Sequence, residues 1–156
     1  MRSYAARDLP FYICPNCKTR SVDVDGREGF SAQAPACRAC SFGFLFELQD
    51  DYYPAPTAGL VACDRDGRIL ASGRGVFELT GFREHDLLGR EVREAFVLRG
   101  PDGGRDPIGL ALEWGVRRLG ERLTLRTRAG IEKPVVADVF PALDEDGGLL
   151  VALAAA

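Results

Sequence analysis

Four cysteines near the start of the chain stand in two matched pairs. Cys14 and Cys17 form the first Cys-x2-Cys pair, Cys37 and Cys40 form the second, and residues 18–36 separate them. A Cys-x2-Cys turn directs two thiolates at one ion, and two such turns supply the four tetrahedral ligands of a structural metal site. The spacing therefore predicts a four-cysteine metal site, and we expect structural Zn²⁺, with iron as the alternative ion.

The chain offers few other groups for catalysis. A metal with four protein ligands has no open position for water or substrate. His85 is the only histidine, and most hydrolytic and nucleophilic schemes use a histidine as base. We therefore expect a protein that is not an enzyme, with His85 on its surface.

Composition narrows the class of protein. The 156 residues are 46% hydrophobic and 28% charged, with a formal net charge of −3, which is ordinary for a globular protein and argues mildly against general nucleic-acid or membrane binding. No run reaches the roughly 18 apolar residues of a membrane span, and the N-terminus has no signal-peptide core. We expect a cytoplasmic protein, where reducing conditions favour metal binding over disulfides.

The residues around the cysteines predict a small β-rich module. Residues 11–13 read as a strand that leads into the first cysteine pair, and residues 21–24 and 41–48 alternate between polar and apolar side chains. A sheet of this size buries too little area to fold alone, so the metal would supply the missing free energy. Residues 49–57 form a short proline-bearing linker.

Residues 58–156 alternate blocks of strand and helix. Apolar runs and turn residues predict strands at 59–63, 68–71, 122–127, 135–143 and 149–153, with helical pieces at 74–80, 83–88, 89–96 and 106–119. Asp106 is placed to cap the last helix, with Pro107 at its first position. Strands on both sides of a helical block predict an α+β domain with an antiparallel sheet.

Five segments of this second part resemble those of a PAS domain, in the order that family has. They are residues 61–70, 77–82, 84–90, 124–130 with the following Pro134-Val135, and 144–147. The resemblance covers about residues 55–156, and residues 10–48 similarly resemble a four-cysteine zinc ribbon. It implies an α+β fold: a PAS-like five-stranded antiparallel sheet with helices on one face, plus a small β-rich zinc ribbon. The expected units are a ribbon at 1–48, a linker at 49–57 and a PAS-like domain at 58–156.

The resemblance also implies a cavity between the helices and the sheet for an unidentified small ligand. The side chains expected to line it are apolar, namely Phe77, Phe82, Phe96, Leu112, Trp114, Leu125 and Val139. Trp114 reads equally well as plain core or interface packing. Haem-binding relatives carry their ligand on the later helix, where this chain has no histidine. Flavin-adduct relatives carry a cysteine in the helical block, and residues 74–119 contain none. We expect neither haem nor a flavin adduct, and Cys63 reads as a buried hydrophobe.

One position departs from the family pattern. PAS domains often have an asparagine directly after the second strand, where this chain has Gly73. Any contact made by that asparagine is therefore missing, and Ser72 is the nearby candidate for capping the first helix.

These patterns predict a non-catalytic bacterial signalling module. The PAS-like domain would sense a small ligand or bind a protein partner, including a second copy in a homodimer, and no membrane is expected. Eighteen arginines against two lysines are typical of a high-GC bacterial genome. The alternatives are a nucleic-acid-binding adaptor that uses the ribbon and a redox- or metal-responsive switch at the four cysteines. Residues 1–50 carry six basic and six acidic side chains, and nucleic-acid binding needs a net positive face.

Overall fold

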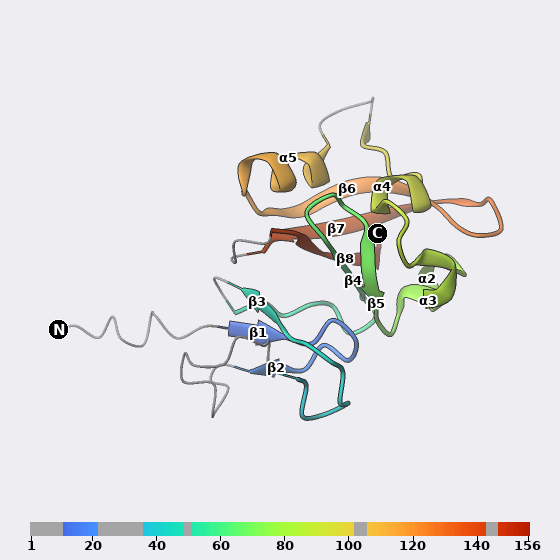
Figure 1. Ribbon diagram of the computed structural model, residues 1–156. Helices are drawn as coiled ribbons and strands as arrows, with labels where there is room; N and C mark the ends of the chain where they lie inside the picture. The colour runs from blue at the N-terminus through green and yellow to red at the C-terminus, as the bar shows by residue number, and fades with distance from the viewer. Residues whose placement is uncertain (1–10, 22–35, 49–50, 102–105, 143–146) are drawn as a thin grey trace.

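The chain folds into two antiparallel sheets, a small one and a larger one that carries helices (Figure 1). The computed structural model describes residues 11–21, 36–48, 51–101, 106–142 and 147–156. The small sheet contains the cysteine pairs, and the larger sheet contains the strands expected after residue 58. The predicted α+β class is confirmed, with a five-stranded antiparallel sheet and a small β module.

The small sheet has the order β2-β1-β3. Its strands are β1 (Phe11–Ile13), β2 (Arg20–Ser21) and β3 (Phe46–Leu48). Predicted strand 11–13 is confirmed, whereas predicted strand 41–48 begins only at Phe46. Hydrogen bonds of the second cysteine turn, from the Cys37 N–H to the Phe42 carbonyl and from the Ser41 N–H to the Cys37 carbonyl, hold the first residues of that range instead. Of predicted strand 21–24, only Ser21 lies within the described residues.

The larger sheet has the order β5-β4-β8-β7-β6, all antiparallel. Its strands are β4 (Gly59–Cys63), β5 (Ile69–Ser72), β6 (Arg118–Arg126), β7 (Glu132–Pro141) and β8 (Leu149–Ala155). The first and last strands of this sheet in sequence order, β4 and β8, pair with each other, and β8 is its central strand. This pairing joins the two ends of the PAS-like segment in the middle of the sheet. Of the predicted turn 144–147, only residue 147 lies within the described residues.

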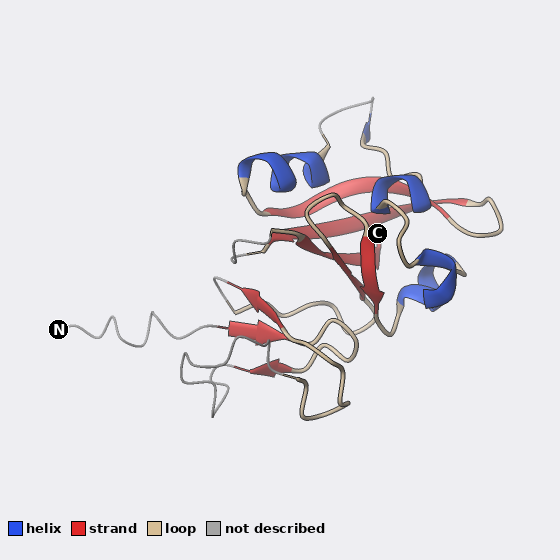
Figure 2. Ribbon diagram, in the orientation of Figure 1, coloured by secondary structure: helices blue, strands red, loops and turns tan. Residues whose placement is uncertain are grey.

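The helices described by the structure lie on one side of the larger sheet (Figure 2). They are α2 (Val76–Thr80), α3 (Glu84–Leu87), α4 (Val92–Ala95) and α5 (Pro107–Trp114). The predicted helix 106–119 is wrong at its end, because Gly115 adopts a left-handed conformation with φ 64° and caps α5 through a hydrogen bond to the Ala111 carbonyl. Residues 118 and 119 belong to β6 instead. No helix in the described ranges is long and apolar enough to cross a bilayer.

The adjacent strands β4 and β8 of the larger sheet are buried on both faces. Leu149, Val151 and Leu153 of β8 enter the core under the helices. Leu150 and Ala152 point the other way and pack with residues of the small sheet. A strand covered on both faces reads as a continuous apolar run, which explains the sequence LLVALAA of β8.

Candidate metal centre

The four predicted cysteines converge on one point. Their sulfur atoms all lie within 4.8 Å of one another. The Sγ atoms of Cys14 and Cys40 are 3.6 Å apart, and those of Cys17 and Cys37 are 3.7 Å apart. A tetrahedral zinc ion with bonds of about 2.3 Å places its sulfur ligands about 3.8 Å apart. The cysteines are therefore positioned to bind a metal ion, and the two closest sulfur pairs have the separation of a tetrahedral site.

The two cysteine pairs form equivalent turns. The Lys18 N–H donates to the Cys14 carbonyl at 3.0 Å, and the Ser41 N–H donates to the Cys37 carbonyl at the same distance. Lys18 and Ser41 both adopt left-handed conformations, with φ of 68° and 67°. Glycine is the residue that best tolerates this region, so neither turn has a signal in the sequence beyond the cysteine spacing.

Hydrogen bonds from the first turn reach sulfur atoms of both pairs. The backbone N–H groups of Asn16 and Cys17 donate to Cys14 Sγ at 3.3 and 3.4 Å, and Asn16 Nδ2 donates to Cys40 Sγ at 3.5 Å. The Asn16 side chain is the main cause that lowers the pKa of Cys40 to about 6, whereas burial raises the pKa of Cys14 to about 12. A divalent ion deprotonates the thiols that coordinate it, so Cys14 depends on the ion for its charge.

The first cysteine turn lies against the larger domain at Gly73. A Cβ atom added to Gly73 would lie 1.9 Å from the Pro15 carbonyl oxygen and 2.8 Å from Asn16 Cα. The Arg74 N–H donates to the Asn16 carbonyl at 3.0 Å. The presence of glycine at position 73 therefore has a physical explanation, because any side chain there would push the cysteine turn away. The predicted Ser72 cap is wrong, because the N-cap of α2 is Gly75, without a side-chain hydrogen bond.

Lys18 forms a second link between the two units. Its Nζ donates to the carbonyls of Pro56 and Ala58 at 3.0 and 2.6 Å. Those carbonyls belong to the segment that leads into β4. The left-handed residue of the first turn thus fastens the turn to the start of the larger sheet, a contact that sequence reasoning missed.

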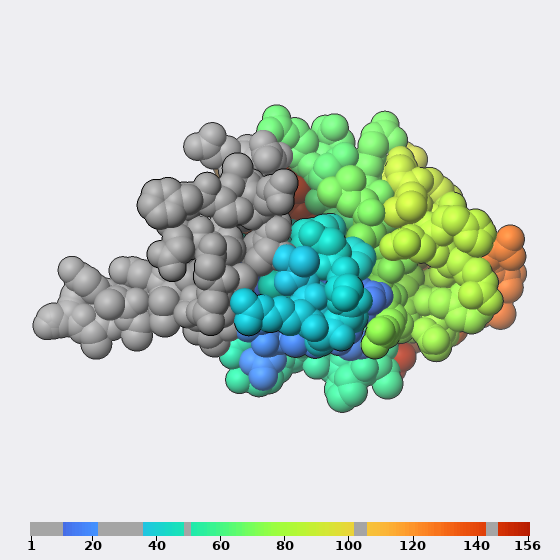
Figure 3. All heavy atoms as spheres, turned by 60° about the horizontal axis from the view of Figure 1, so that its bottom comes forward, coloured from blue at the N-terminus to red at the C-terminus, as the bar shows by residue number. Residues whose placement is uncertain are grey.

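Apolar side chains extend this interface over the outer face of the larger sheet. One buried cluster joins Ile13, Phe46 and Leu48 of the small sheet to residues of the larger one, among them Leu60, Ala62, Phe140, Leu150 and Ala152. Figure 3 shows the cyan spheres of residues 36–48 set against green spheres of the larger domain. The small sheet is therefore packed on the face opposite the helices.

The linker takes part in the same interface. The Tyr52 ring lies 4.5 Å from the Phe140 ring, and the Tyr52 hydroxyl donates to Asp138 Oδ2. The other oxygen of Asp138 accepts from the Gly120 N–H at 2.7 Å. Burial, and then the neighbouring Asp138 carboxylate, raise the pKa of Tyr52 above its ordinary value. Nearby, Arg20 pairs with Asp51 at 2.8 Å.

The predicted cavity residues separate into two groups. Phe96, Leu125 and Val139 are fully buried between helices and sheet, and Phe82 and Leu112 pack against that core. Phe82 meets Phe96 edge-on at 5.9 Å. Phe77 and Trp114 instead lie on the surface, 42% and 72% exposed, so neither lines an interior space. Trp114 is the last residue of α5, and Arg83 covers the Phe77 ring at 4.1 Å.

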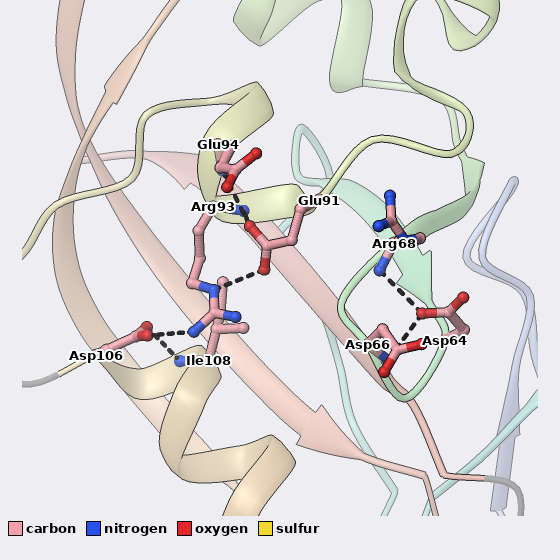
Figure 4. Close-up of polar contacts among 8 residues, drawn as sticks. All are labelled: Asp64, Asp66, Arg68, Glu91, Arg93, Glu94, Asp106 and Ile108. Carbon is pink, nitrogen blue, oxygen red and sulfur yellow. Dashed lines mark hydrogen bonds and ion pairs between the residues drawn. The ribbon is translucent and has the colours of Figure 1, made fainter.

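Two N-cap carboxylates fix the helical side of the larger sheet. Glu91 accepts from the N–H groups of Arg93 and Glu94 at the start of α4, and Asp106 accepts from the Ile108 N–H at the start of α5. Arg93 pairs with both carboxylates at 2.6 Å (Figure 4). The predicted Asp106 cap is confirmed. An open depression of about 380 Å³ lies beside this network, lined by Arg93, Asp106, Gly109, Leu110, Leu112 and Glu113.

The larger domain is similar in fold to solved PAS structures, although no family model and no curated protein matches the sequence. A PAS domain from Colwellia psychrerythraea is 18% identical, with a TM-score of 0.53, over 64% of this chain and 86% of that chain. A variant of Vivid, a fungal blue-light photoreceptor, is 19% identical with a TM-score of 0.54, over 69% and 83% of the two chains. The larger domain has a PAS/LOV fold.

A third PAS-fold neighbour is the light-state LOV domain of the blue-light photoreceptor Aureochrome1. It is 25% identical, with a TM-score of 0.51, over 63% of this chain and 80% of that chain. The fold covers about two thirds of the present chain, and the cysteine module lies outside this unit. The predicted resemblance is therefore confirmed for the fold of the PAS domain.

The remaining single-residue predictions concern His85 and Cys63. The His85 side chain is 78% exposed and lies 3.4 Å from Asp86, which agrees with a surface residue. Cys63 is buried in β4, and burial raises the pKa of its thiol. It lies in the PAS core, apart from the four converging sulfurs.

Proposed function

We propose that the chain is a non-catalytic signalling module. Its PAS domain senses a small ligand or binds a protein partner on the helical side, and its ribbon holds a structural zinc ion. The observation that carries the proposal is that the cysteine ribbon covers the outer face of the PAS sheet. The helical face, where α4 and α5 meet the sheet, is the side left for sensing. The open depression beside Arg93 lies on that side.

The site fits a structural zinc ion better than a catalytic metal ion. All four ligand positions are supplied by cysteines, two of them buried, so a bound ion keeps no position for substrate. The helical block has no cysteine between residues 74 and 119, which disfavours flavin-adduct photochemistry of the kind expected from light-sensing relatives. A reversibly bound small molecule is the ligand class that we propose.

Native mass spectrometry of the purified full chain tests both halves of the proposal. One zinc per chain and a second, small-molecule mass that is lost on collisional activation are the expected results. The zinc peak serves as the internal control for a folded protein. Zinc without any second mass, together with no stabilising hit in a thermal screen of metabolites, would contradict ligand sensing and leave partner binding.

Self-association needs a surface other than the centre of the PAS sheet. Leu60, Phe140 and Leu150 on that face pack with the ribbon in each copy, so a homodimer formed there would have to displace it. We propose that any dimer leaves this face covered. Light scattering after size exclusion measures the stoichiometry, and protection of the β8 amides on dimerisation would contradict the proposal.

Nucleic-acid binding is the weaker alternative. Two basic side chains of the described ribbon are already engaged, Lys18 with backbone carbonyls and Arg20 with Asp51. Phosphate contacts would have to compete with these interactions. A fluorescence titration with duplex and single-stranded DNA at low salt is expected to show no binding, and salt-dependent saturation would revive this function.

A further inference from the structure

Asn16 connects the metal site to the PAS domain by three hydrogen bonds. Its backbone N–H donates to Cys14 Sγ at 3.3 Å, its side chain donates to Cys40 Sγ at 3.5 Å, and its carbonyl accepts from the Arg74 N–H at 3.0 Å. The two sulfurs belong to different cysteine pairs, which a shared ion would hold together. Asn16 therefore stands between the metal ligands and the backbone of Arg74.

We propose that metal binding at the four cysteines controls the order of the β5–α2 junction, residues 73–76, with Asn16 as the positioning residue. The ribbon then acts on the PAS helical side in addition to stabilising itself. The proposal goes beyond the signalling function above and does not require a ligand in the PAS domain.

Close packing at Gly73 leaves no room between the two units. The space where its Cβ would lie is taken by the Pro15 carbonyl and by Asn16. Gly73 itself is held by a hydrogen bond from its N–H to the Leu60 carbonyl at 2.9 Å. A displacement of the cysteine turn is therefore passed directly to the backbone that follows β5.

The start of α2 has little support of its own. Its N-cap, Gly75, has φ 102° and supplies no side-chain hydrogen bond. The helix is only five residues long, and an isolated helix of this length is unstable in water. Gly75 lies against the Ala58 carbonyl, which Lys18 also holds at 2.6 Å. Two of the contacts around this helix start thus lead back to the first cysteine turn, beside the hydrogen bond from the Gly73 N–H to the Leu60 carbonyl and the burial of Val76.

The junction leads into the helical side of the PAS domain. Val76 and Thr80 of α2 are buried, and the Thr80 hydroxyl oxygen accepts from the Phe82 N–H at 3.1 Å. Phe82 in turn meets Phe96 in the core. Loss of order at the junction would therefore reach the aromatic pair under the helices, which is the region proposed for sensing.

Hydrogen exchange on the full chain tests the inference. Zinc-loaded protein is compared with protein treated with a chelator and a phosphine reductant, so that no disulfide forms. Exchange in the peptide that covers residues 74–81 is expected to be about three- to tenfold faster without metal, the factor for the loss of one hydrogen bond. Residues 122–126 of β6, whose buried side chains Leu123 and Leu125 belong to the core under the helices, serve as the distant reference. Unchanged exchange at 74–81, while residues 11–21 lose protection, would overturn the proposal.

A pair of glycine substitutions separates steric coupling from general damage. In Gly73→Ala the new methyl group meets the cysteine turn, whereas in Gly43→Ala it meets nothing within 4 Å. Gly73→Ala is expected to bind one zinc and to exchange rapidly at 74–81 with or without metal, while Gly43→Ala behaves as wild type. A normal metal-dependent difference in Gly73→Ala would contradict the proposal. Should Gly73→Ala fail to fold, the wild-type comparison still decides.

Asn16→Ala provides an independent variant that leaves the steric contact in place. It removes only the side-chain hydrogen bond to Cys40. Zinc affinity, measured by competition with a chromophoric chelator, is expected to fall about 10- to 100-fold, as for other groups that orient metal ligands. At saturating zinc the exchange at 74–81 is expected to stay faster than in wild type, because the side-chain link from Cys40 to the turn is missing. Wild-type exchange at saturating zinc would show that the metal does not act through this contact.

Discussion

Lys18 and Ser41 occupy the same position in the two cysteine turns, and both are left-handed. A non-glycine residue in this conformation costs about 1 kcal/mol. The Ser41 side chain is exposed, and no side-chain hydrogen bond to the described residues offsets this cost. The Lys18 side chain instead donates to two carbonyls, those of Pro56 and Ala58, in the segment before β4. At the scale of single residues, equivalent positions therefore have different energetic roles.

Ser41→Gly and Lys18→Gly are expected to change stability in opposite directions. Ser41→Gly should raise the free energy of unfolding by up to about 1 kcal/mol, because the backbone strain is relieved. Lys18→Gly should lower it, because two charged hydrogen bonds of about 1.5 kcal/mol or more each are lost. Urea denaturation of zinc-loaded protein measures both, and two changes of the same sign would be evidence against this role of Lys18.

The sequence places both Phe96 and Trp114 among the expected cavity residues, but only Phe96 is buried. Phe96→Ala is expected to cost about 3–5 kcal/mol of stability through the cavity it creates. Trp114→Ala should stay within about 0.5 kcal/mol of wild type, because its side chain is already in solvent. Urea denaturation gives both values. A large loss for Trp114→Ala would mean that the side chain is packed in solution.

The residues of the metal site could be predicted from spacing, but their surroundings could not. The Cys-x2-Cys pattern specifies the ligands because the turn is local. The contact of Asn16 with Arg74 joins residues far apart in sequence, and no local pattern encodes it. Gly73 departs from the family pattern, and the cause is the cysteine turn that packs against it.

Among the elements, the linker is part of the interface. Residues 51–53 pack beside the larger sheet through Tyr52, which contacts Phe140 and Asp138. The prolines of the linker predict a semi-rigid connection, but they do not predict which residues of the larger sheet Tyr52 contacts. In helix α5 the local pattern misleads about length. The apolar stripe in the sequence continues past Trp114, but Gly115 ends the helix.

Tyr52→Phe is expected to lower the free energy of unfolding at neutral pH. It should also make that free energy fall less steeply as the pH becomes alkaline. At neutral pH the loss of a hydrogen bond to a carboxylate should cost about 1.5–3 kcal/mol. The pKa of Tyr52 is raised in the folded protein, so its contribution is complete below the unfolded value of about 10 and falls as the pH rises above it. Urea denaturation between about pH 7 and about pH 10.5 should show a steeper alkaline decline for wild type than for Tyr52→Phe. Parallel profiles would rule out this role.

For the whole molecule, the order of elements in the PAS domain was predictable because each strand and helix has its own local pattern. The position of the ribbon was not. Residues on β4 and β8 are apolar on both faces, which predicts burial but not what covers each face. The structure places the ribbon on the outer face, so the cysteine module and the PAS fold share one interface.

Calorimetric unfolding with and without zinc tests this shared interface most directly. The zinc-loaded chain is expected to unfold in a single transition. Removal of zinc under reducing conditions should lower the Tm of the PAS domain by about 10 °C, since each kcal/mol of lost stability lowers the Tm of such a domain by about 4–8 °C. Two separate transitions, with the PAS transition unchanged by zinc removal, would contradict a shared interface.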